Sequence, residues 1–180
     1  ASFNDGLLKA VSCANLSGQF TYYQNHRPLG QSRVILSDTL GRKSIAWMND
    51  SGSFTIRRIL PGSWMLQPET QLAWGGGNST DALLIMRHFA RLDTLAGLSL
   101  EAADVDNSGT ILATDALRVA QRFAQLIGPF SAGDWIMPSV TLNLGPGNHQ
   151  ILLEAACRGD VNATWQPAVN SALPASLKGP

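Results

Sequence analysis

The feature that most constrains this chain is a run of twelve residues from Asp104 to Asp115, which we call the continuous loop. Oxygen-bearing side chains stand at its first, third, fifth and twelfth positions: Asp104, Asp106, Ser108 and Asp115. Gly109 stands at the sixth position, where a calcium-binding loop turns sharply, and the backbone carbonyl of Thr110 falls at the seventh. Ca²⁺ prefers about six to eight oxygen ligands, and this spacing wraps such ligands around one point. The continuous loop therefore predicts a calcium site.

A simpler interpretation is a turn rich in Asp, Asn, Ser and Gly that caps the apolar helical run 116–123. A capping turn explains Gly109, but it leaves three carboxylates within twelve residues unexplained. Carboxylates that converge on one point repel one another unless a cation lies between them. We therefore favour the calcium site.

Composition excludes two classes of partner. The chain has 180 residues, enough for one large or two small domains, and a hydrophobic content of 44% supports a real core. The formal net charge is zero and no stretch is strongly basic, which argues against nucleic acid. No run of about 18 apolar residues is present, which argues against membrane insertion. Because the chain opens at Ala1 without a signal peptide, we expect a mature fragment of a longer protein.

Two cysteines, Cys13 and Cys157, lie near opposite ends of the chain. Two thiols are too few for a metal centre, and the three histidines show no ligand spacing. We expect a disulfide, which would stabilise the fold by about 4–5 kcal/mol in the chain-entropy model. A disulfide would imply an extracytoplasmic location, and two buried thiols remain the alternative.

Short β-patterned runs separated by turns occupy much of the chain. The expected strands are 16–23, 32–36, 44–48, 53–56, 64–67, 139–144 and 149–155. Spacings near ten residues predict an antiparallel β-sandwich. Five runs resemble carboxypeptidase-regulatory-like and Cna-B-like sandwich modules: Leu16–Tyr22, Pro28–Leu29, Val34–Asp38, Asp50–Phe54 and Leu60–Trp64. Such modules carry more strands, and the runs after residue 138 would supply them.

The segment between the two groups of strands has a helical period and an internal repeat. Helices are expected over 82–92, 99–103 and 116–127. Residues 80–92 repeat at 114–126, an offset of 34 residues, and each copy opens with Thr-Asp-Ala-Leu. Two loop-helix units of this EF-hand-like kind resemble dockerins. Dockerins are calcium-binding modules that attach enzymes to scaffoldins, as in cellulosomes, through cohesin domains.

The first repeat departs from the dockerin pattern ahead of Asp81. The positions aligned with the first calcium ligands hold side chains that cannot bind calcium as a set: Thr70, Leu72 and Trp74. The missing oxygen side chains recur near the C-terminus, at Asp160, Asn162 and Thr164. These three residues align with the first, third and fifth positions of the continuous loop.

We therefore predict a second calcium site in a split loop, whose front half is Asp160–Thr164 and whose back half is Gly75–Asp81. Gly75 would stand at the glycine position, and Trp165 would lie beyond the cut. The back half would supply three ligands: the Gly76 carbonyl, Asn78 through its side chain or a water molecule, and the Asp81 carboxylate. Gly77 departs from the pattern, because it replaces an apolar residue. This arrangement corresponds to a circularly permuted dockerin-like unit that binds two calcium ions.

The expected fold class is α+β: an antiparallel β-sandwich with an inserted helical dockerin-like unit of two calcium loop-helix motifs. The sandwich would comprise residues 13–72 and 139–157, the dockerin-like unit residues 73–138 and 158–166, and a linker or tail residues 167–180. The runs 74–84 and 159–162 resemble C-terminal regions of secreted Bacteroidetes proteins. This resemblance implies a secreted or cell-surface location.

The dockerin resemblance implies a non-catalytic module that docks its parent protein to a cohesin-like or cell-surface protein when calcium is bound. In dockerins, hydroxyls late in each loop and polar residues a turn or two later contact the cohesin. By position, the partner-binding residues would be Thr80, Arg87, His88, Thr114, Gln121 and Arg122.

Two other functions stay open. One is a structural spacer stabilised by calcium and a disulfide, and the other is a polysaccharide-binding sandwich. The aromatic residues that could stack on sugars are Trp64, Trp74, Tyr22 and Tyr23, and core packing is their competing role. No Ser-His-Asp, Cys-His or paired-carboxylate arrangement is evident, so we expect no catalytic residues.

Overall fold

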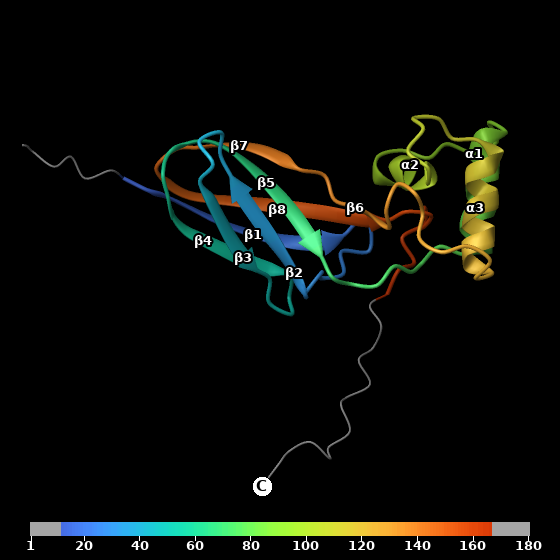
Figure 1. Cartoon of the computed structure of the whole chain (residues 1–180), viewed down its shortest axis with the longest axis horizontal. Coiled ribbons are helices and arrows are strands. Elements are labelled where there is room, and N and C mark those ends of the chain that lie inside the picture. Colours follow the sequence, from blue (N-terminus) through green and yellow to red (C-terminus); the bar gives the residue numbers. More distant parts are fainter. Residues whose placement is uncertain (1–11, 167–180) are drawn as a thin grey trace, which may run out of the picture. The chain divides into compact units, whose positions relative to one another are not determined.

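The computed structural model describes residues 12–166 and shows a chain of the α+β class (Figure 1). Its elements group into two compact units. Among the described residues, the first comprises 12–21, Pro28–Thr70 and Met137–Glu154, and the second comprises Tyr22–Arg27, Gln71–Ile136 and 155–166. The expected α+β class with antiparallel sheets is confirmed. The tail expected at 167–180 lies outside the described residues.

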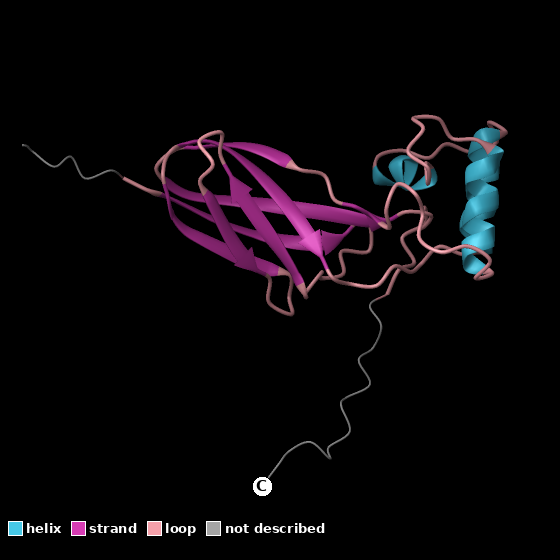
Figure 2. Ribbon diagram, viewed as in Figure 1, coloured by secondary structure: helices cyan, strands magenta, loops and turns pink. Residues whose placement is uncertain are grey.

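Two four-stranded, largely antiparallel sheets contain the strands of this part of the chain (Figure 2). One sheet has the order β4-β1-β8-β6, and the other has the order β3-β2-β5-β7. The strands are β1 (Ala14–Tyr22), β2 (Ser32–Ser37), β3 (Lys43–Trp47), β4 (Ser53–Ile59), β5 (Gly62–Thr70), β6 (Trp135–Ile136), β7 (Val140–Leu144) and β8 (Gly147–Cys157).

Buried and more exposed side chains alternate along the strands of the first unit, so its sheets have a buried face. In β2, Val34 and Leu36 are buried and their neighbours are half-buried. In β5, the buried Trp64 and Leu66 flank the exposed Met65. Leu36 pairs with Leu66, so the period-two patterns of both strands fall on the same face.

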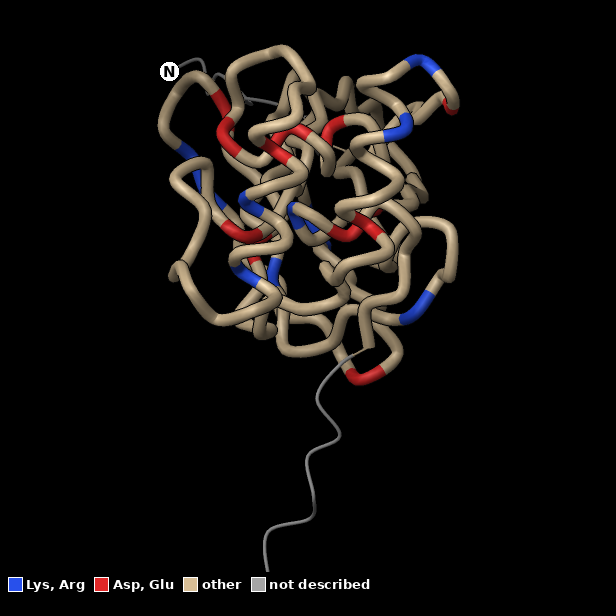
Figure 3. Tube along the Cα trace, turned by 90° about the vertical axis from the view of Figure 1, so that its right-hand side faces the viewer, with Lys and Arg blue, Asp and Glu red and all other residues tan. Residues whose placement is uncertain are grey.

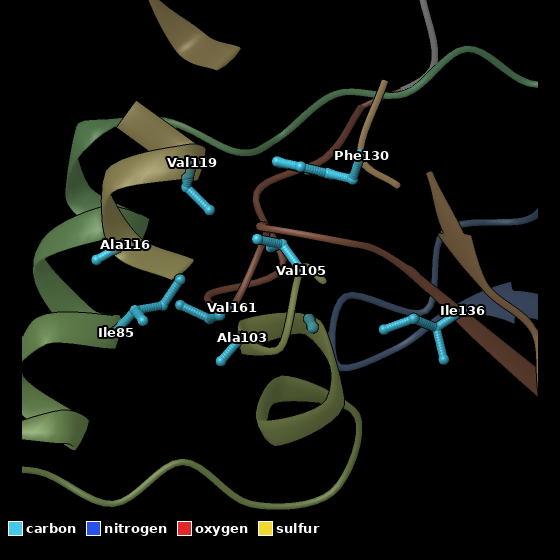
Figure 4. Packing of buried hydrophobic residues seen from close by; sticks show 9 residues of the cluster. Ile85, Ala103, Val105, Ala116, Val119, Phe130, Ile136 and Val161 are labelled. Carbon is cyan, nitrogen blue, oxygen red and sulfur yellow. The ribbon is translucent and has the colours of Figure 1, made fainter. Parts of the chain in front are cut away.

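The second unit contains α1 (Ser79–Phe89), α2 (Leu98–Ala103) and α3 (Ala113–Phe123), which follow β5 in the chain. Its core is a cluster of Ile85, Ala102, Ala103, Val105, Ala116, Val119, Phe130, Ile136 and Val161 (Figure 4). Val105 is the second residue of the continuous loop, and Val161 is the second residue of the split loop's front half. Both loops and both long helices therefore contribute to one core.

Helices α1 and α3 end in the same way, which extends the repeat from sequence to geometry. Each is closed by an alanine, Ala90 or Ala124, with a φ of −76°. The next residues, Arg91 and Gln125, adopt the left-handed conformation with φ values of 60° and 59°. This conformation ends a helix because it turns the chain away from the helix axis.

The surface charge of the chain is mixed. Figure 3 shows Lys and Arg interspersed with Asp and Glu along the trace, in keeping with the formal net charge of zero. Among residues 12–166, no helix is long and apolar enough to cross a membrane.

The expected disulfide is wrong: Cys13 and Cys157 are not joined. The N–H of Gly147, the first residue of β8, donates to the carbonyl of Cys13. Cys157 is the last residue of the same 11-residue strand. The two ends of such a strand are roughly 30 Å apart, whereas a disulfide requires Cα atoms within about 7 Å of each other.

The aromatic side chains of the alternative polysaccharide-binding function are mostly core residues, which is their competing role. Trp64, Tyr22 and Tyr23 are at most 4% exposed, so their rings are part of the core. Trp74 is half-buried, and the guanidinium carbon of Arg122 lies 3.9 Å from the centre of its ring. Three of these four rings are therefore buried, and Arg122 covers one face of the Trp74 ring.

Candidate metal centre

The continuous loop brings three carboxylates together ahead of α3. Oxygen atoms from Asp104, Asp106 and Asp115 lie within 4.8 Å of one another. The hydroxyl of Ser108 donates to the carbonyl of Thr110 at 3.1 Å. All of these groups offer oxygen, which suits a hard cation such as Ca²⁺ better than a metal that prefers nitrogen or sulfur.

Backbone N–H groups hold the first and last carboxylates of this loop. Asp104 accepts hydrogen bonds from the fifth and sixth residues, Ser108 at 2.9 Å and Gly109 at 2.7 Å. Asp115 accepts hydrogen bonds from the second and ninth residues, Val105 at 3.1 Å and Leu112 at 2.9 Å. The second of these bonds fixes the backbone at the start of α3, so the loop and the helix form one structure.

The two halves of the split loop lie together, although 80 positions separate Asp81 from Val161. The Thr164 hydroxyl lies 3.2 Å from the Gly76 carbonyl and 3.2 Å from Asp160 Oδ1. Asp81 Oδ1 accepts the N–H of Val161 at 2.9 Å. The structure therefore brings a front-half carboxylate, a hydroxyl, a back-half carbonyl and a back-half carboxylate into one cluster.

The hydrogen bonds of the split loop repeat those of the continuous loop position by position. Asp160 accepts from the fifth residue, Thr164, at 2.9 Å and from the residue that follows it, Trp165, at 2.8 Å. The N–H of Trp165 thus takes the place of the sixth residue, the position expected for Gly75. Asp81 accepts from the second and ninth residues, Val161 at 2.9 Å and Asn78 at 3.0 Å. The hydroxyl-to-carbonyl bond between the fifth and seventh residues recurs between Thr164 and Gly76. One geometry is thus formed by a continuous backbone and again by two separate segments.

The Asn162 side chain lies among oxygen atoms. One terminal atom of its carboxamide is 3.0 Å from Asp160 Oδ1, 3.0 Å from the Thr164 hydroxyl and 3.2 Å from Asp81 Oδ1. In the absence of a cation, the amide nitrogen satisfies these three neighbours by donating to them. With a cation at the centre, the amide oxygen would take this position as a ligand.

Asn78, expected as a ligand of the split loop, has a different role. Its side-chain oxygen accepts the N–H of Thr80 at 2.8 Å and caps α1. Its amide nitrogen donates to the Gly76 carbonyl at 2.8 Å. The structure therefore uses the Asn78 oxygen at the helix end and does not bring it into the ligand cluster.

Two glycines of the back half leave no space for a side chain. A Cβ at Gly76 would lie 2.3 Å from Asp160 Oδ2, and Gly76 also has a φ of +85°. A Cβ at Gly77 would lie 2.8 Å from the Trp74 ring. The left-handed glycine is the seventh residue, Gly76, whereas in the continuous loop it is the sixth, Gly109. The departure at Gly77 is therefore explained by close packing of the backbone.

Two indole groups connect the halves beside the cut. Trp74 Nε1 donates to the Arg158 carbonyl at 2.7 Å. Trp165 Nε1 donates to the Ala73 carbonyl at 3.1 Å. The segments that flank the two halves thus donate one hydrogen bond to each other in each direction.

Burial sets the electrostatics of both loops. Burial, together with the charge of Asp160, raises the pKa of Asp81 to about 6. Burial also raises the pKa of Asp115. A hydrogen bond from Ser108 lowers the pKa of Asp106 below its usual value. A bound cation would favour the charged forms of all three carboxylates, so the donor set fits Ca²⁺.

The residues expected to contact a partner divide into two groups. Thr80, Arg87 and Thr114 are exposed, and His88 and Gln121 are half-buried. Arg122 is buried, with its guanidinium between the rings of Trp74 and Phe130 and ion-paired with Asp134. The assignment of Arg122 to a partner surface is therefore wrong.

An apolar groove between α1 and α3 was missed by the sequence analysis. It has a volume of about 410 Å³ and is lined by Ala82, Leu83, Met86, Ala113, Ala116, Leu117 and Ala120. Leu83 and Leu117, which the repeat relates, are 59% and 56% exposed. The signal in the sequence was the leucine that follows Thr-Asp-Ala in each copy of the repeat. Helical spacing alone assigns both of these leucines to the core.

Comparisons with known proteins agree with this geometry in part of the chain. Residues 78–124 match the family of dockerin type I domains. The matched segment contains α1, α2, α3, the continuous loop and the last four residues of the split loop's back half. A match of this kind indicates calcium-dependent interaction with a cohesin-like partner.

A crystal structure of a DUF3823 family protein from Parabacteroides merdae is similar to 81% of this chain, with 14% sequence identity and a TM-score of 0.36. The chain covers 47% of that protein. No curated protein matches the sequence.

Proposed function

We propose that this chain is a non-catalytic, calcium-dependent interaction module that attaches its parent protein to a cohesin-like or cell-surface scaffold outside the cell. The helical part would be a circularly permuted dockerin-like unit, inserted in a β-sandwich and completed by Asp160–Thr164. The observation that carries the proposal is the repetition of one hydrogen-bond pattern in both loops. The dockerin type I match over 78–124 supports the calcium and the class of partner.

The two calcium sites would draw on different ligands. In the continuous loop the ligands would come from Asp104, Asp106, Ser108, Thr110 and Asp115, and in the split loop from Asp160, Asn162, Thr164, Gly76 and Asp81. Calcium supplies the positive charge that allows these carboxylates to converge. Because Asp81 and Asp115 also fix the first turns of α1 and α3, bound calcium would stabilise both helices.

The partner surface would be the groove between α1 and α3. Exposed apolar side chains such as Leu83 and Leu117 would provide the contact area. Thr80, Arg87 and Thr114 would supply polar contacts next to this groove, with His88 and Gln121 contributing their exposed parts. An apolar centre with polar groups around it is the usual composition of a specific protein interface.

Calcium removal tests the metal part of the proposal. Each ion bound at about 1,000 times its Kd stabilises the folded state by about 4 kcal/mol. We therefore expect EGTA to lower the Tm by about 10 °C or more, since 1 kcal/mol shifts the Tm of a chain this long by about 2–4 °C. An unchanged Tm after chelation would rule out the proposed function.

Two variants separate the sites. Asp104→Ala and Asp160→Ala are each expected to reduce the calcium stoichiometry, measured by native mass spectrometry, from two ions to one. If Asp160→Ala still binds two ions, the split loop and the permutation are wrong, while the continuous site stands.

A binding experiment tests the partner. The calcium-loaded chain should capture a cohesin-like protein from envelope proteins of its source, and EGTA should release that protein. Leu83→Asp is expected to weaken the capture, because it introduces a charge into the groove, while calcium binding stays unchanged. Calcium binding without any captured protein would favour a calcium-stabilised spacer.

A further inference from the structure

The two oxygens of the Asp160 carboxylate face different surroundings. Oδ2 accepts hydrogen bonds from the Tyr22 hydroxyl at 2.6 Å and from the Trp165 N–H at 2.8 Å. Oδ1 lies 3.2 Å from the Thr164 hydroxyl and 3.0 Å from the terminal atom of Asn162. Oδ1 therefore faces the ligand cluster of the split loop, and Oδ2 faces the surrounding protein.

Tyr22 is itself held tightly. Its side chain is fully buried, and its ring stacks on Trp165 with centroids 5.1 Å apart and an interplanar angle of 18°. Its hydroxyl accepts the N–H of Cys157 at 2.9 Å, so the remaining proton is directed to Asp160. A phenolic hydroxyl is protonated at neutral pH, so it is able to donate.

The bond from Tyr22 goes beyond the pattern of the continuous loop. There the equivalent carboxylate, Asp104, accepts two backbone bonds, from Ser108 and Gly109. Asp160 has the two equivalent bonds and adds the bond from Tyr22. The additional bond occurs in the loop whose front and back halves are not joined by a peptide bond.

The segment Tyr22–Arg27 holds the front half at further points. The Tyr23 hydroxyl donates to the backbone carbonyl of Asp160 at 2.9 Å. The Asn25 amide donates to the Ala163 carbonyl at 2.9 Å. These two bonds fix the backbone of the front half, whereas the Tyr22 bond fixes the side chain that would bind calcium.

We propose that Tyr22 is a positioning residue for calcium in the split loop. Its hydroxyl holds Asp160 Oδ2 and thereby directs Oδ1 toward the calcium, so it sets the affinity of this loop without contacting the ion. The inference rests on the proposed calcium-binding function. It adds that a residue 138 positions from Asp160 controls one site and not the other.

The experiment compares Tyr22→Phe with Tyr23→Phe in an Asp104→Ala background, in which the split loop is the remaining calcium site. Loss of an outer hydrogen-bond partner of a metal ligand commonly weakens metal binding by about 10–100-fold. We expect Tyr22→Phe to weaken calcium binding, measured by isothermal titration calorimetry, by this factor. Tyr23→Phe removes the buried hydroxyl that donates to the backbone carbonyl of Asp160. This substitution should change the calcium affinity by less than about threefold.

The outcomes are distinguishable. If the parent chain binds fewer than two calcium ions, the proposed function or its split site fails, whatever Tyr22 does. If the parent chain binds two ions and Tyr22→Phe binds calcium as tightly as the background, this inference alone is wrong. An equal loss of calcium affinity in Tyr23→Phe would also overturn the inference, because the loss would then come from the packing of the segment Tyr22–Arg27.

A kinetic measurement covers the case in which Tyr22→Phe folds only with calcium. Tyr22→Phe with an intact continuous loop is loaded with calcium and mixed with a fluorescent chelator in a stopped-flow instrument. We expect one of the two release phases to be about 10-fold faster than in the parent chain and the other to be unchanged. Two unchanged phases would contradict the inference.

Discussion

Single residues decide whether a loop made of two segments can close. Gly76 approaches Asp160 so closely that a Cβ would lie 2.3 Å from the carboxylate oxygen. Gly109, in the continuous loop, has a similar φ of +81°, but a Cβ there would meet no neighbouring atom within 4 Å. The two glycines therefore share a backbone requirement, and only Gly76 has a packing requirement as well.

We expect Gly76→Ala to be more damaging than Gly109→Ala. Each substitution places a Cβ on a left-handed residue, which costs about 1 kcal/mol. Gly76→Ala also displaces Asp160, so we expect a total loss of about 3 kcal/mol or more from the free energy of unfolding. Urea unfolding in calcium buffer measures both losses.

Calcium stoichiometry provides the control for this pair of variants. Gly76→Ala should lose the split site and keep the continuous site. Equal losses of stability in the two variants would mean that the loop halves adjust to a side chain at position 76, contrary to the packing described above.

The continuous loop could be found from sequence because all of its proposed calcium ligands lie within twelve residues. The split loop was found because Asp81 lacked its front half and Asp160 lacked its back half. Tyr22 could not be found, because a tyrosine at the end of a strand has the pattern of a core residue. Its contact with Asp160 exists only once the chain has folded. The close packing of Gly77 depends on Trp74 in the same way.

At the scale of elements, α1 and α3 are two copies of one helix with different surroundings. Arg122 of α3 lies between the Trp74 and Phe130 rings and pairs with Asp134. Its counterpart in α1 is His88, whose Nδ1 accepts the N–H of Leu95 at 3.1 Å. One position of the repeat thus fixes a different connecting segment in each copy.

We expect Arg122→Ala to destabilise the fold by about 2 kcal/mol. It breaks the ion pair with Asp134 and removes the guanidinium that packs on the Trp74 and Phe130 rings. Arg87→Ala, on the exposed face of α1, is the matched control and should change stability by less than about 0.5 kcal/mol. Thermal melting of both variants, with calcium present, measures the difference. A neutral Arg122→Ala would return this residue to the candidate partner surface.

Helical periodicity predicted the presence of α1 and α3, because the apolar spacing of each is local. Both helices begin three residues earlier than expected and also end earlier. The role of Arg122 was assigned incorrectly, since position in the repeat gave it the exposure of a helix surface. Trp74 and Phe130, which cover it, lie outside the repeat. The exposed groove was missed for the opposite reason, because Leu83 and Leu117 looked like core residues.

At the scale of the whole molecule, alternation and turns predicted the strands and the α+β class. The order of strands in the sheets could not be predicted from those local patterns. Nor could the direction of β8 beside its neighbour β1. Gly147 bonds to Cys13 and Tyr23 bonds to Ala155, so the two strands run the same way and Cys13 lies at the end of β8 opposite to Cys157. The expected disulfide required Cys13 to lie beside Cys157.

We therefore expect a reducing agent to leave stability unchanged. A disulfide closing so long a loop would contribute about 4–5 kcal/mol, and its reduction would lower the Tm by about 10 °C or more. Thermal melting with and without dithiothreitol, at a fixed calcium concentration, measures the effect. A fall of that size would show that the two cysteines are bridged in solution.

Because its two halves are far apart in the sequence, the split loop can close only late in the synthesis of the chain. The twelve residues of the continuous loop are synthesised together, so this loop can close as soon as they leave the ribosome. Asp81 must wait for the N–H of Val161, 80 positions later, which at ordinary rates of translation takes roughly 4–16 s. The split loop therefore closes late, only after synthesis of the chain has passed Val161.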